Sequence, residues 1–186
     1  MPPVRPWRWW ASPNGSCSMV ERKRSLDRRR GARYAAIQAL YQIDLTGRDA
    51  VDVVAEFERH RLDDLFVKDE TGSQSEGVDR EMFQDLVLGV AARQAELDPV
   101  LESHLAEGWS LRRCGYTLRA MLRAGAWELK ATPATTVGTI ITEYVELARG
   151  FFDGKEPAFV HAVLDHSAPD LRKPPTSLAD LVDPNG

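Results

Sequence analysis

Arginine side chains gather near the start of the chain, where Arg28, Arg29, Arg30 and Arg33 lie close together. The planar guanidinium group bonds two phosphate oxygens at once and stays charged at physiological pH. If a helix begins here, Arg29, Arg30 and Arg33 share one face at spacings of three and four residues. Positive charge at a helix start opposes the helix dipole, so a structural reason for the cluster is weak. The pattern therefore indicates a polyanion site.

The charge distribution along the chain supports the same hypothesis. Residues 1–33 carry nine basic and two acidic side chains, a net charge of +7 that leaves −11 for the rest of the chain. A basic arm on an acidic body is typical of a protein with a polyanion at one end and a different partner elsewhere. A solvated basic tail without a ligand is the alternative.

Patterns for catalysis and metal binding are missing from the sequence. His161 and His166 would lie about 140° apart on a helix and share no face. The sequence contains no HExxH, no glycine-rich phosphate loop and no GxSxG. The two cysteines, Cys17 and Cys114, are too few for a four-cysteine zinc site, and a reduced cytoplasm is their natural setting. We therefore expect no enzyme, no metal, no cofactor and, without a long apolar run, no membrane span.

The elements that must position the arginines are helical throughout. Apolar residues repeat with the helical period, and no alternating run between turn residues predicts a strand. Proline breaks helix interiors, so Pro99 predicts the end of a third helix and Pro169 the stop of the last one. A fifth helix is expected from about Tyr116 to Lys130. The fold class is therefore all-α, with about seven helices.

The domain organisation follows from composition. We expect a basic, disordered extension over residues 1–27, a helical domain over residues 28–171 and a flexible tail over residues 172–186. A polar segment, residues 68–77, reads as a mobile linker inside the domain.

Five segments, in order, resemble the NusB family of transcription antitermination proteins. They are residues 28–41 (RRRGARYAAIQALY), 83–90 (FQDLVLGV), 118–129 (LRAMLRAGAWEL), 143–149 (EYVELAR) and 159–165 (FVHAVLD). The resemblance covers about residues 28–172 and implies two packed helical bundles without enzymatic activity. Thr142, His161 and Ala162 depart from the family pattern, and these departures fall partly on the side that the family uses for RNA.

The resemblance also implies a function and a set of site residues. It implies that the chain pairs with NusE, a small-subunit ribosomal protein, binds the boxA element of nascent ribosomal RNA and promotes RNA polymerase processivity. The exposed helix acids Glu143 and Glu146 are weak candidates for the NusE surface. The implied RNA-binding residues are Arg28, Arg29, Arg30, Arg33, Lys155 and Phe159.

Phe159 has two interpretations. An aromatic ring can stack on a base of single-stranded RNA, but the spacing of Phe159 to Val163 also fits a core residue.

Two other classes of function stay open. The same helical domain occurs as the front half of an rRNA cytosine methyltransferase, so a stand-alone rRNA-binding domain is one alternative. Without a Rossmann half or a glycine-rich nucleotide loop, we do not expect the whole enzyme. A purely protein-binding helical module with an incidental basic tail is the other.

Overall fold

The computed structural model describes residues 17–63 and 77–173, and it confirms the all-α class. These residues contain no strand and form six helices and one short 3-10 turn. Their bounds are α1 (Cys17–Thr46), α2 (Ala50–His60), α3 (Arg80–Ser103), η1 (Leu111–Arg113), α4 (Tyr116–Ala131), α5 (Val137–Phe151) and α6 (Glu156–Leu171). Among the described residues, no helix is both long and apolar enough to span a bilayer.

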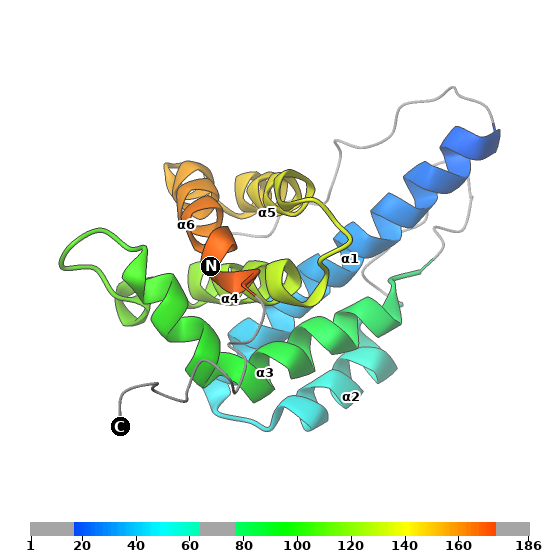
Figure 1. Cartoon of the computed structure of the whole chain (residues 1–186). Helices are drawn as coiled ribbons and strands as arrows, with labels where there is room; N and C mark the ends of the chain where they lie inside the picture. The colour runs from blue at the N-terminus through cyan, green and yellow to red at the C-terminus, as the bar shows by residue number, and fades with distance from the viewer. Residues whose placement is uncertain (1–16, 64–76, 174–186) are drawn as a thin grey trace, which may run out of the picture.

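The helices form two groups that meet along α4. Helices α1, α2 and α3 pack on one another, as do α4, α5 and α6, and α4 also packs on α1 and α3 (Figure 1). All ten residues from Ala120 to Leu129 of α4 are buried. A helix that is buried all round lies in the core of its domain. The two packed bundles implied by the resemblance are thus confirmed, with α4 at their junction.

Helix α1 begins well before the arginines. It runs over 30 residues from Cys17, which makes it about 45 Å long at 1.5 Å per residue, and its first turns extend beyond the other helices (Figure 1). The expectation that Arg28 to Arg33 open a helix is therefore wrong, because they lie in its interior. The argument from the helix dipole does not apply to them.

Two prolines do not end helices as expected, and the first of them, Pro99, reduces the seven predicted helices to six. The third and fourth predicted helices form the single helix α3, which bends at Arg93 (φ −123°, ψ 17°) and continues through Pro99. An interior proline costs about 3 kcal/mol of helix stability. Leu97 and Leu101 flank Pro99 on one face and are both fully buried, which offsets that cost. Helix α6 likewise continues past Pro169 to Leu171, which is also buried.

Buried residues fix the chain on both sides of residues 64–76. Leu62 is 1% exposed and Val78 is 5% exposed, and both belong to the same hydrophobic core. Most of the expected linker, residues 68–77, lies outside the described residues, as do residues 1–16 of the expected extension and residues 174–186 of the tail. The domain boundaries at residues 28 and 171 stay predictions.

A glycine allows close contact between α3 and α4. A Cβ atom on Gly89 would lie 2.2 Å from Nε1 of Trp127, whose side chain is mostly buried and donates a hydrogen bond to Asp85 (3.2 Å). The guanidinium of Arg93 lies 4.8 Å from the centre of the Trp127 ring. The indole is therefore held in place and has little room to move.

We expect Gly89→Ala to destabilise the protein by about 1–3 kcal/mol, as overpacking does. Gly138→Ala on α5 is the matched control, because a Cβ there meets nothing within 4 Å. That substitution should be neutral or stabilise by up to about 1 kcal/mol. Urea unfolding followed by circular dichroism measures both changes. Equal stability of the two variants would show that Trp127 can move away.

Candidate nucleic-acid interface

Arg33 lies in the core rather than on the surface. Its side chain is 4% exposed, and it donates two parallel hydrogen bonds to Glu128 on α4, from Nη2 to Oε1 (2.6 Å) and from Nε to Oε2 (2.9 Å). The hydroxyl of Tyr144 on α5, which is fully buried, donates to the same carboxylate (3.0 Å). The expectation that Arg33 contacts RNA is therefore not met, because its guanidinium group already donates to Glu128 inside the protein.

Arg33 and Tyr144 keep their ordinary protonation states at neutral pH. Burial alone would lower the pKa of Arg33, but the hydrogen bond and charge of Glu128 outweigh it, and the pKa is raised. Burial, followed by the negative charge of Glu128, raises the pKa of Tyr144 well above its usual value. Arg33 thus remains a cation and Tyr144 a neutral hydrogen-bond donor.

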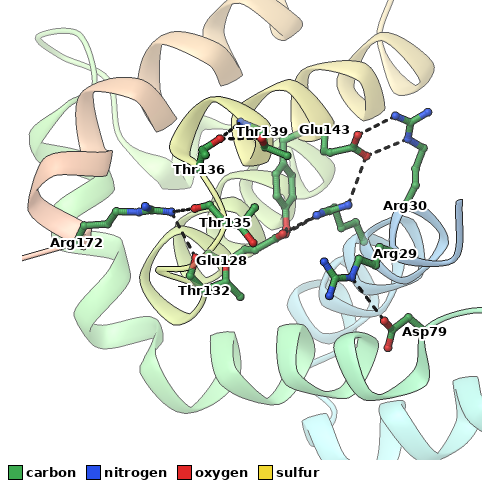
Figure 2. A network of polar contacts seen from close by, with 12 residues as sticks. Arg29, Arg30, Asp79, Glu128, Thr132, Thr135, Thr136, Thr139, Glu143 and Arg172 are labelled. Carbon is green, nitrogen blue, oxygen red and sulfur yellow. Dashed lines mark hydrogen bonds and ion pairs between the residues drawn. The ribbon is translucent and has the colours of Figure 1, made fainter. Parts of the chain in front are cut away.

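Glu143 also belongs to the interior. Arg30 donates to it through Nε (3.0 Å to Oε2) and Nη2 (2.9 Å to Oε1), and Arg33 donates through Nη1 (3.4 Å to Oε2). Figure 2 shows Arg30 on α1 and Glu143 on α5 pointing toward each other. Since Glu143 is only 8% exposed, it offers no surface to a partner protein, and that expectation is wrong. Glu146 is half-buried and pairs with Arg149 on the same helix.

Exposure increases along the arginine face toward the start of α1. The exposed fraction of the side chain rises from 4% at Arg33 through 31% at Arg30 to 53% at Arg29. Arg28 is exposed as well. Arg29 makes a loose ion pair with Asp79 (Nε to Oδ2, 3.9 Å; Figure 2), and the backbone of Asp79 donates to the carbonyl of Arg28 (3.2 Å). Arg28 and Arg29 are therefore the two accessible members of the cluster.

Lys155 and Phe159 lie together at the start of α6. Lys155 is the exposed residue that precedes the helix, and its carbonyl accepts a hydrogen bond from the backbone of Phe159 (3.0 Å). Phe159 is partly buried and packs against the core, which agrees with the core interpretation, while stacking on RNA stays a prediction. Its ring centre lies 6.1 Å from that of Trp109.

The sequence reasoning overlooked Trp109 and Arg113. Trp109 is 51% exposed, and the guanidinium of Arg113 lies 5.5 Å from its ring centre. The sequence does hold a signal for this pair of residues. Trp109 stands between Gly108 and two consecutive arginines, and an exposed aromatic ring among basic residues suits stacking on nucleic-acid bases.

Cys114 is a buried thiol. Burial raises its pKa, which the positive charge of Arg119 offsets only in part. A thiol with a raised pKa is a poor nucleophile at neutral pH.

Comparison with known proteins identifies the family. The sequence pattern of the NusB family matches residues 30–169. The chain belongs to the NusB family. Transcription antitermination protein NusB of Brucella ovis is 44% identical to it over 149 residues, which cover 80% of this chain and 85% of that protein. The family is non-enzymatic, as the resemblance implied.

Solved structures of NusB proteins share the fold. The solution structure of NusB from Aquifex aeolicus superposes with a TM-score of 0.58 at 29% identity, covering 74% of this chain and 85% of that one. A crystal structure of the antitermination factors NusB and NusE in complex with double-stranded RNA superposes with a TM-score of 0.59 at 27% identity, covering 76% and 96%.

The two arginines with different surroundings should respond differently to substitution. Arg33→Ala leaves the carboxylate of Glu128 buried without its cation and should destabilise the protein by about 3–5 kcal/mol. Arg29→Ala removes an exposed side chain and should change stability by no more than about 0.5 kcal/mol. Urea unfolding of both variants checks this. A loss below about 1 kcal/mol for Arg33→Ala would contradict the structural role of the pair.

Proposed function

We propose that this chain binds boxA RNA of nascent ribosomal RNA transcripts together with NusE, and thereby promotes RNA polymerase processivity in the cytoplasm. The observation that carries the proposal is the pair of accessible cations, Arg28 and Arg29. Both are exposed and lie closer to the start of α1 than Arg30 and Arg33, whose guanidinium groups are occupied by carboxylates. Accessible arginines without a saturating partner suit phosphate groups.

A second group of residues supports RNA binding at the start of α6. Lys155 offers an exposed charge, and Phe159 next to it presents part of an aromatic ring. Proteins that bind unpaired RNA combine stacking on such rings with backbone charge. We therefore assign Arg28, Arg29, Lys155 and Phe159 to the RNA interface and leave Arg30 and Arg33 to the fold.

The proposed partners follow from a related protein. Since a related NusB is found in complex with NusE and RNA, we assign the same two partners to this chain. The net charge of −11 outside the basic arm favours a basic protein on the body of the molecule. The RNA in that complex is double-stranded, so a duplex arm belongs in every binding experiment.

Arg29→Ala should weaken RNA binding and flatten its salt dependence. Each phosphate contact with single-stranded RNA contributes a slope of about −0.7 in log affinity against log salt, and the variant should lose about that amount. Phe159→Ala should reduce affinity without changing the slope, because stacking releases no counterions. Fluorescence anisotropy with a labelled single-stranded boxA RNA, and with its duplex form, measures both.

Arg59→Ala is the matched control for charge. Arg59 is an exposed arginine on α2, and within the part of the chain that the structure describes its Nε donates to a backbone carbonyl of its own helix (3.0 Å). It should leave affinity and slope unchanged. Equal effects of Arg29→Ala and Arg59→Ala would indicate non-specific attraction. Unchanged affinity of Arg29→Ala in a folded protein would contradict the proposed interface.

Complex formation with NusE should precede RNA binding. We expect the two proteins to co-elute from a size-exclusion column at micromolar concentration without RNA, and NusE to raise the affinity for boxA RNA because a second basic protein extends the site. Failure to co-elute would favour the stand-alone RNA-binding domain. Co-elution without any RNA binding would favour the protein-binding module.

A further inference from the structure

The loop between α3 and η1 holds a half-exposed tryptophan in a defined position. Gly108 adopts a left-handed backbone conformation (φ +78°), and the backbone N–H of Trp109 donates to the carbonyl of Ala106 (2.9 Å), which closes a turn. A positive φ of this kind favours glycine. The turn leaves 51% of Trp109 exposed, which is unusual for so large an apolar side chain outside an interface.

Arg113 fixes this loop from the side of η1. Its Nη1 donates to the carbonyl of Gly108 (2.7 Å), and its guanidinium lies 5.5 Å from the centre of the Trp109 ring. The arginine therefore positions the turn and places a positive charge beside the indole. A ring that is already oriented loses little conformational freedom when it binds a ligand.

The indole of Trp109 lies beside Phe159, a residue in the first turn of α6. The two ring centres are 6.1 Å apart and the ring planes are tilted by 47°. At this distance the rings contact each other, so a ligand stacks on their outer surfaces rather than between them. Two exposed cations lie near the pair: Arg113 is beside the Trp109 ring, and Lys155 precedes Phe159 by one helical turn.

We propose that Trp109 and Phe159 form a two-ring platform on which unpaired RNA bases stack, with Arg113 positioning Trp109. This inference rests on the proposed RNA-binding function and extends the interface from α6 to the loop before η1. Stacking on an aromatic side chain is tolerant of base identity, since every base has a π-face. The platform should therefore add affinity for single strands and little discrimination between bases.

The surroundings of the platform favour RNA over a protein partner. Arg113 lies against the Trp109 ring, and the exposed Lys155 precedes Phe159 by one helical turn, so the rings lie among positive charges that suit an RNA backbone. The other large exposed apolar side chains among the described residues, Leu45, Val51 and Tyr116, belong to other elements and do not extend the platform. An isolated aromatic pair among cations matches the recognition of single-stranded nucleic acid.

The test compares three variants of the full chain on the same labelled single-stranded boxA RNA. Trp109→Ala should weaken binding by at least about fivefold, the lower end expected for one stacked base, with an unchanged salt slope. Trp109→Phe, which keeps a ring, should retain most of the affinity. Tyr116→Ala is the matched control and should bind like the wild type. Tyr116 is also an exposed aromatic residue (42%), with the guanidinium of Arg119 5.0 Å from its ring centre, but it packs edge-on against Tyr41 on α1.

A second measurement identifies the contact directly. BoxA RNA substituted with 5-iodouridine should cross-link on irradiation to the peptide that contains Trp109, as shown by mass spectrometry. Circular dichroism of each variant checks that the fold is intact.

Each outcome decides one proposal. If the wild type binds no RNA, the proposed function itself fails. If the wild type binds and Trp109→Ala binds equally well without a cross-link at Trp109, the platform is wrong while the function stands. If Trp109→Ala reduces co-elution with NusE but not RNA affinity, the tryptophan is a protein contact and the platform is likewise overturned.

Discussion

The buried ion pair between Arg33 and Glu128 is the interaction on which the rest of the structure depends. It joins α1 to α4, and Tyr144 and Glu143 connect the same pair to α5. Removing two charges from water is costly, and only a nearly complete set of hydrogen bonds offsets that cost. The ion pair therefore fixes the orientation of α1 about its own axis, because only one orientation directs Arg33 toward Glu128. With Arg33 directed inward, the same helical face carries Arg30 at its edge and Arg29 in solvent.

Much of the fold could be predicted from the sequence because the helical period of apolar residues is strong. The fifth predicted helix, from about Tyr116 to Lys130, matches α4 to within one residue. Pro99 misled the prediction because a local rule cannot account for the burial of Leu97 and Leu101 on either side of it. The start of α1 was missed because the basic composition of its first turns carries no apolar period.

The candidate site was predicted less well, because the residues that pair with its arginines lie far from them along the chain. The spacing of Arg29, Arg30 and Arg33 gave the shared face correctly, but the partners that bury Arg33 lie 95 and 110 residues away. A signal was present on both sides. Glu128 stands within an apolar helix, and Arg33 lies between Ala32 and Tyr34 in a segment rich in alanine, so each charge needed a buried partner. Glu143 was misjudged for the same reason.

The two buried residues that flank residues 64–76 affect how many residues the chain can hold between them. Leu62 and Val78 are fixed in the same core, so the path between them begins and ends at points that the core determines. Closing a longer loop between fixed ends costs only about 0.6 kcal/mol for each doubling of its length. The core therefore tolerates insertions between these two anchors. An affinity tag placed there should leave the core intact, and natural relatives are free to differ in length at this point.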